Sequence, residues 1–278
     1  MGVYYYSAAK DVKCNLSFHI LTDINESGIR LIITDSNPLE TRMAPLGIIS
    51  GIVLLQGKGI FDNLEEREMA TEFGKALVFS SDAIAFIPRH GKDRRRHILP
   101  HLINHRANLK ALSDLGVKEV ISVNSTGSLK RNLAPGTFVV PDDFLMLTET
   151  PTTVGGKAFH ITPRLDEEVR QKWMAAATDC GIDVVNGGVY WQTQGPRFET
   201  KAEIRMMSQF ADVVGMTMAS EAAIAQELGL SYASLCSVDN YANGLGEREL
   251  TVDEILQHAR KNADIVLKIV TRYMERRT

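Results

Sequence analysis

The sequence predicts an α/β domain in which a mixed central sheet is flanked by helices. Strand-like runs rich in β-branched and aromatic residues alternate along the chain with helical patterns, and this alternation is typical of that class. Several of the strand-like runs are continuously apolar, as strands covered on both faces should be. With 278 residues and a hydrophobic content of 44%, the chain is long enough to bury a large single core.

Each expected element occupies its own stretch of the chain. Strands are predicted at 46–55, 83–87, 119–123, 137–140, 184–190, 213–216 and 231–237. Helices are predicted at 100–115, 166–180, 201–210, 220–228 and 251–276. Residues 1–44 differ, because polar turns separate short alternating pieces at 3–7, 16–22 and 29–34, and these predict an added hairpin. We therefore expect an N-terminal extension of unknown role at 1–44 and the main domain at 45–278.

Composition narrows the class of function. The net charge of −3 gives no global reason to expect binding to nucleic acid or to an anionic membrane. Three scattered cysteines fit a reducing compartment better than a disulfide framework. Since no apolar run approaches the roughly 20 residues of a membrane span, we expect a cytoplasmic protein. No phosphate loop of the GxxxxGKS/T or GxGxxG type occurs, which argues against nucleotide hydrolases and dinucleotide enzymes.

The first candidate site residues follow two apolar strands. Arg89 and His90 come directly after the strand at 83–87 and offer a fixed cation beside an imidazole, which suits an oxyanion. Asn124 and Ser125 follow the strand at 119–123, in a turn whose hydroxyls and backbone amides suit an anion or a sugar. Two alternatives without a ligand remain. Arg89 and His90 follow their strand by chance, and Asn124 and Ser125 belong to an ordinary polar turn.

A flat ring and a sugar are suggested by two later stretches. The turn at 194–200 presents Phe198 and Glu199 just before a helix. Met216 and Thr217 close a strand and place a flexible thioether and a hydroxyl at its end, although such residues more often belong to a core.

A stripe of histidines is the one candidate metal site in the sequence. Residues 97, 101 and 105 are spaced i, i+4 and i+8, but no acidic or cysteine partner lies at ligand spacing. We therefore predict that no metal binds there.

In this order, these stretches resemble the family of trimeric purine nucleoside phosphorylases and methylthioadenosine phosphorylases. The resemblance extends from about residue 46 to the C-terminus and rests on the segments 89–91, 100–112, 124–129, 135–136, 195–203 and 211–217. It implies a nucleoside phosphorylase-like fold, a homotrimer or a dimer of trimers, and inorganic phosphate as co-substrate with no metal or organic cofactor. The chain departs from the family pattern where only Ser50 and Gly51 match the usual Gly-rich phosphate loop.

Carried over by position, the resemblance implies a role for each matching residue. Phosphate would be held by Ser50, Arg89, His90, Ser125 and Thr217. The nucleoside would be contacted by Asn124, Phe198, Glu199, Met216, Asn240 and, from a neighbouring subunit, His160. The catalytic residues would be Asn240, Glu199 and His90. Asp239, next to Asn240, is either a turn residue or a protonated carboxyl that reads the N7 of adenine.

Such a site would cleave the N-glycosidic bond of a purine nucleoside to give a free purine and a ribose 1-phosphate. The polarity of Glu199 favours a 6-oxopurine, because its N1–H donates to a carboxylate, whereas the N1 of a 6-aminopurine is an acceptor. At the 5′ end, Met216 and His160 fit a methylthio group as well as a hydroxyl, so inosine, guanosine and methylthioinosine all remain candidate substrates. The alternatives are a methylthioadenosine phosphorylase, a nucleosidase that uses water, and a purine-binding protein without activity.

Overall fold

The computed structural model describes residues 19–25, 28–34, 43–51, 59–93, 96–156, 158–246 and 251–277, without the side chains of 19–34, 252 and 254. The chain divides into two compact units, at residues 1–43 and 44–278. In the first unit, β1 (His19–Asn25) pairs antiparallel with β2 (Gly28–Thr34), and the sequence had predicted a hairpin here. The expected piece at 3–7 lies outside the described residues. So do residues 52–55 of the strand expected at 46–55.

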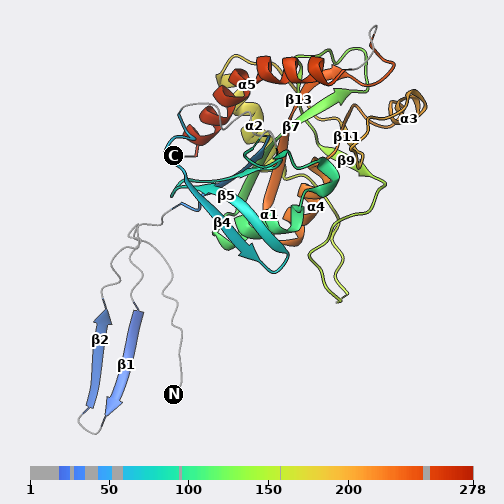
Figure 1. Cartoon of the computed structure of the whole chain (residues 1–278). Helices are drawn as coiled ribbons and strands as arrows, with labels where there is room; N and C mark the ends of the chain where they lie inside the picture. The colour runs from blue at the N-terminus through green and yellow to red at the C-terminus, as the bar shows by residue number, and fades with distance from the viewer. Residues whose placement is uncertain are drawn as a thin grey trace. The chain divides into compact units, whose positions relative to one another are not determined.

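The second unit is built on a mixed sheet, which confirms the predicted fold class (Figure 1). At its centre, β3 (Leu46–Ser50) runs parallel to both β6 (Ile84–Pro88) and β7 (Glu119–Ser128), and β7 runs parallel to β13 (Ser231–Tyr241). Beyond β13, the sheet continues with β8 (Phe138–Val140), which is antiparallel to β13, and then with β10 (Val184–Asn186).

The outer part of the sheet contains strands that the sequence analysis missed. Next to β6 lies an antiparallel hairpin of β5 (Gly74–Ser80) and β4 (Glu65–Thr71), and β4 forms the sheet's edge. Its sequence, EEREMAT, is charged and mostly exposed, so it carries no apolar pattern. A further short strand, β9 (Asp143–Met146), pairs with β11 (Val189–Gln192), which also pairs with β12 (Val213–Gly215).

The strand predicted at 184–190 is wrong as one element. Gly187 and Gly188 adopt φ values of 95° and 112°, a backbone region that side-chain-bearing residues rarely occupy. The chain therefore turns between β10 and β11, which lie in different parts of the sheet.

The five expected helices are present, with one shifted start. They are α1 (His105–Asp114), α2 (Glu167–Asp179), α3 (Lys201–Met207), α4 (Met218–Glu227) and α5 (Val252–Glu275). The first was expected to begin at Pro100, but Pro100–Leu102 is a separate 3-10 turn. Helix α1 begins later because the side chain of Asn104 caps it, accepting from Ala107 N at 3.0 Å.

Two hydrophobic cores lie on opposite faces of the sheet. Ile48 and Ile49 are neighbours in β3, yet Ile48 belongs to the core with α2 and α5, and Ile49 to the core with α1 and α4. Figure 1 shows these helix pairs on the two sides of the sheet. In the described part of the chain, no helix is long and apolar enough to cross a membrane.

Candidate active site

Two adjoining cavities open where the parallel strands β3, β6 and β7 end. One has a volume of about 410 Å³ and includes the predicted ring-binding residues, and the other, of about 490 Å³, lies against α5. Both are lined by Arg89, His90 and Ser125, so these residues stand at the junction of the two. The carboxyl ends of parallel strands are where α/β sheets usually bind ligands.

The guanidinium of Arg89 is held from three directions. Its Nε donates to Oε1 of Glu221 at 2.6 Å, its Nη2 donates to Oε2 at 3.0 Å, and its Nη1 donates to Val123 O at 2.9 Å. Arg89 and Glu221 are both almost completely buried. Such a pair fixes the direction of the remaining N–H groups, since a guanidinium has five donors in a rigid plane.

Glu221 was not identified as a site residue from the sequence. It lies in α4, and its Oε2 also accepts from the hydroxyl of Tyr232 at 2.8 Å. The available signal was an acidic side chain within the small and apolar run 218–225 that opens this helix. A buried acid in such a helix requires a buried partner, which the sequence alone could not name.

Thr217 is positioned by a second network of buried hydrogen bonds. Nδ2 of Asn124 donates to Oγ1 of Thr217 at 2.7 Å, while Oδ1 of Asn124 accepts from the hydroxyls of Ser122 and Ser234. Because Thr217 Oγ1 accepts from Asn124, its own proton is left to donate to a ligand. Asn124 was expected to contact the nucleoside, but the structure puts it beneath the cavities, where it supports Thr217.

The two histidines at the junction are stacked. The rings of His90 and His97 lie 4.4 Å apart with an angle of 17° between their planes. Nδ1 of His90 is 2.8 Å from Ile98 O, and since a carbonyl only accepts, Nδ1 carries a proton. Burial, together with the charge of Arg89, lowers the pKa of His90 to about 4. The ring is therefore neutral near pH 7, with its lone pair on Nε2.

The 410 Å³ cavity also collects the predicted ring and sugar residues. Phe198, Glu199, Met216 and Asn240 all line it, and among the described residues Glu199 is the only acidic side chain that does so. Oε1 of Glu199 accepts from the hydroxyl of Thr193 at 2.6 Å.

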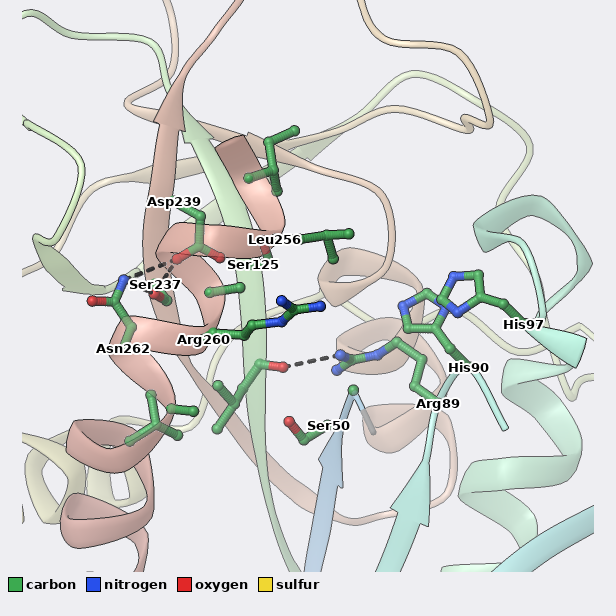
Figure 2. Close-up of a pocket in the computed structure, with 16 residues that line it drawn as sticks. Ser50, Arg89, His90, His97, Ser125, Ser237, Asp239, Leu256, Arg260 and Asn262 are labelled. Atoms are coloured by element: carbon green, nitrogen blue, oxygen red, sulfur yellow. Dashed lines mark hydrogen bonds between the residues drawn. The ribbon is translucent and has the colours of Figure 1, made fainter. Parts of the chain in front are cut away.

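Asp239 and Asn240 line different cavities. Asp239 faces the 490 Å³ cavity, where its Oδ1 accepts from Ser237 Oγ at 2.7 Å and from Asn262 Nδ2 at 2.9 Å (Figure 2). Its Oδ2 is buried without a hydrogen-bond partner among the described residues, and burial raises the pKa of the carboxyl. The β7–β13 register shifts between Val238 and Asn240, which leaves Asp239 as the unpaired residue of a bulge. That Asp239 reads the base stays a prediction, since this residue lines the cavity against α5 and not the one lined by Phe198 and Glu199.

The other predicted residues have mixed positions. Ser50 lines the 490 Å³ cavity, whereas His160 is exposed and lines neither cavity of this single chain. His105 does not join His97 at a common site, because its ring is buried near Glu221, with Nδ1 3.9 Å from Oε1. Among the side chains that the structure describes, no three histidines, cysteines or acids are grouped to hold a metal ion.

Known proteins resemble this chain along most of its length. A probable 6-oxopurine nucleoside phosphorylase of Archaeoglobus fulgidus is 42% identical over 230 residues, which are 81% of this chain and 93% of that protein. A probable S-methyl-5′-thioinosine phosphorylase of Methanocaldococcus jannaschii is 39% identical over 232 residues, covering 81% and 90% of the two chains.

Solved structures and a family model agree with these relatives. A methylthioadenosine phosphorylase from an antarctic soil metagenomic library matches with a TM-score of 0.75 and 29% identity, over 84% of this chain and 86% of that one. The enzyme of that name from Schistosoma mansoni, in complex with adenine, matches with a TM-score of 0.72 and 29% identity, over 84% and 91%. The model of the phosphorylase superfamily matches residues 54–275. The chain therefore belongs to the phosphorylase superfamily.

Proposed function

We propose that the protein cleaves the N-glycosidic bond of 6-oxopurine nucleosides with inorganic phosphate, giving a free purine and a ribose 1-phosphate. One observation carries the proposal: a single cavity joins an oxyanion end to a ring end. Arg89, His90 and Thr217 line the first, and Phe198, Glu199 and Asn240 line the second. The names of the archaeal relatives support the same reaction.

At the oxyanion end, phosphate would be held beneath C1′ by groups of fixed direction. The free N–H groups of Arg89 and the hydroxyl of Thr217 are donors, and Ser50 and Ser125 supply further hydroxyls at the two cavities. The Nε2 lone pair of His90 would accept the remaining proton of hydrogen phosphate. As the sugar gains oxocarbenium character, its positive charge is attracted to the bound dianion, and this attraction grows only toward the transition state.

At the ring end, the departing purine needs its developing negative charge stabilised. Among the described residues, Nδ2 of Asn240 donates one hydrogen bond, to Tyr241 O at 2.8 Å, which leaves its second N–H for a ligand. Donation of this N–H to N7 or O6 would stabilise the leaving base, while Glu199 accepts from N1–H on the other edge. The buried side chain of Ala242 also lines this cavity, and it offers no acceptor for an exocyclic amino group.

The 5′ end of the substrate would meet an apolar wall. Met216 and Ile255 line the 410 Å³ cavity, and Leu256 and Ala259 of α5 line the adjoining one. Apolar side chains favour a methylthio group, because a methylthio group placed against them needs no hydrogen-bond partner. We therefore propose 5′-methylthioinosine as a substrate alongside inosine, a specificity that the jannaschii relative's name also carries.

The wider setting follows from this reaction. Phosphorolysis is redox-neutral and phosphate itself is the nucleophile, so we propose that no cofactor is used. Cys180 and Cys236 are free thiols, which fits a cytoplasmic enzyme. We further propose a homotrimer or a dimer of trimers in which His160 enters a neighbour's site, because this exposed side chain reaches neither cavity of its own chain.

A substrate panel with product analysis tests the proposal. Inosine, guanosine, adenosine and their 5′-methylthio forms are incubated with and without phosphate, and the sugar products are identified. We expect ribose 1-phosphate, or 5-methylthioribose 1-phosphate from the methylthio forms, only when phosphate is present, and higher kcat/KM for the 6-oxo series. Free ribose at the same rate without phosphate would instead identify a nucleosidase, and faster cleavage of the adenine series would overturn the base assignment.

A further inference from the structure

The cavity beneath α5 holds a cation that the proposed reaction does not yet use. Arg260 lines the 490 Å³ cavity together with Ser50, Arg89 and His90. Figure 2 shows its guanidinium turned toward Arg89 and His90. Within the described part of the chain, Arg260 makes no hydrogen bond or ion pair, unlike Arg272 of the same helix and Arg276 directly after it, which both bind Asp179.

The other described groups at this junction carry little net positive charge. The charge of Arg89 is compensated by Glu221, to which it donates two hydrogen bonds. His90 is held in its neutral form, with Nδ1–H directed to Ile98 O. Asp239, the acid of the same cavity, is bonded to Ser237 and Asn262.

A phosphate bound at the junction therefore needs another counter-charge. Moving a dianion out of water is costly unless cations and donors replace its hydration. The loop after β3 offers only Ser50 and Gly51 of the described residues as lining groups. A guanidinium can supply two parallel N–H donors to two phosphate oxygens together with a full charge.

We propose that Arg260 is a second cationic contact for the phosphate co-substrate and for the phosphate of the sugar product. This inference rests on the proposed function. Arg89, His90 and Ser125 line both cavities, so a phosphate at the junction is in contact with the cavity that Arg260 enters. Arg260 adds the charge that the Arg89–Glu221 pair lacks, and it acts on phosphate binding and not on the purine.

The test compares Arg260→Gln with two matched variants. Arg260→Lys keeps the charge, and Lys261→Gln removes the same charge from the next residue of α5, which is exposed and outside both cavities. We expect Arg260→Gln to raise the KM for phosphate about tenfold, with the KM for inosine within about twofold of the parent. Arg260→Lys should recover most of the loss, and Lys261→Gln should match the parent.

A direct binding measurement separates this inference from the proposed function. Calorimetric titration with phosphate alone should give a weaker affinity for Arg260→Gln by the same factor. An unchanged phosphate affinity in a parent that performs phosphorolysis would overturn the role of Arg260 alone. A rise in the KM for inosine, or an equal effect of Lys261→Gln, would also overturn it. A parent that cleaves inosine without phosphate would instead remove the proposed function.

Discussion

The two ends of the candidate cavity are constructed differently. At the phosphate end, Arg89 and Thr217 are 4% and 6% exposed, and each is bonded to a buried partner. At the purine end, Phe198 is 40% exposed, and the buried carboxylate of Glu199 accepts one side-chain hydrogen bond from the described residues, from Thr193. The phosphate end is thus preorganised for an anion that is the same in every reaction, whereas the aromatic side chain at the purine end is more open to solvent. Substitutions at the first end should therefore change stability and activity together, and those at the second should change activity alone.

Breaking the buried pair at the phosphate end should have the largest effect. Glu221→Gln keeps the shape but leaves the charge of Arg89 buried without compensation. We expect a loss of about 3 kcal/mol in the free energy of unfolding and about a hundredfold fall in kcat/KM for phosphate. Urea unfolding and steady-state kinetics measure the two.

The control for this variant is an exposed pair far from the site. Glu68 and Lys75 lie on the outer hairpin, with 61% and 71% of their side chains exposed. Glu68→Gln should change stability by less than about 1 kcal/mol. Equal effects of the two substitutions would contradict the view that the phosphate end is specially preorganised.

Lowering the pH should reduce the stability of the folded protein through His105, which lies beside the phosphate end. Its ring is buried behind Glu221 with Nδ1 unpartnered, and burial lowers its pKa to about 4. Because the unfolded chain binds a proton below about pH 6.5 and the folded chain does not, stability is full above that pH and declines as the pH falls toward 4. Through this histidine alone, the free energy of unfolding should fall by about 2 kcal/mol between pH 7 and pH 5.

His105→Gln should remove this histidine's share of the stability that is lost at low pH. Urea unfolding at pH 7 and pH 5 would then show a smaller difference than in the parent. His101→Gln, on the exposed 3-10 turn, serves as the control and should keep the parent's difference. If His105→Gln also keeps it, the buried ring does not couple folding to pH.

The contrast between the two ends also explains what could be predicted from the sequence. The central strands were found because continuous apolar runs such as β3 and β6 are covered on both faces. Arg89 was found with its strand because it directly follows β6, and strand ends determine where a site opens. Ser125 was expected in a turn after a strand at 119–123, but it lies within β7, which continues to Ser128. The charged strand β4 was missed because exposed edge strands lack such a pattern.

Pairings between distant residues could not be predicted in this way. Glu221 lies 132 positions from Arg89, and Asn124 lies 93 positions from Thr217. Only packing of α4 against the sheet brings these groups together, and no local pattern encodes it. The place of Arg260 likewise depends on how α5 lies on β13, although the helix itself was predicted.

At the purine end, Glu199→Gln should alter base selection without affecting the fold. A carboxylate only accepts, whereas an amide can turn either its oxygen or its NH₂ toward N1. We expect the preference for inosine over adenosine, measured as the ratio of kcat/KM values, to fall about tenfold. The free energy of unfolding should stay within about 1 kcal/mol of the parent. An unchanged ratio would show that Glu199 does not read N1.

Phe198→Leu should give the smallest effect and the sharpest contrast with Glu221→Gln. The ring lines the cavity but is 40% exposed, so its loss leaves no buried void. Replacing the flat face by a branched chain should cost about 1 kcal/mol of stacking and raise the KM for inosine severalfold. The KM for phosphate and the midpoint of thermal unfolding should stay at the parent's values, because Phe198 is not among the residues that we assign to phosphate and its side chain is exposed. A lowered midpoint, or a raised KM for phosphate, would mean that the two ends are built as one unit.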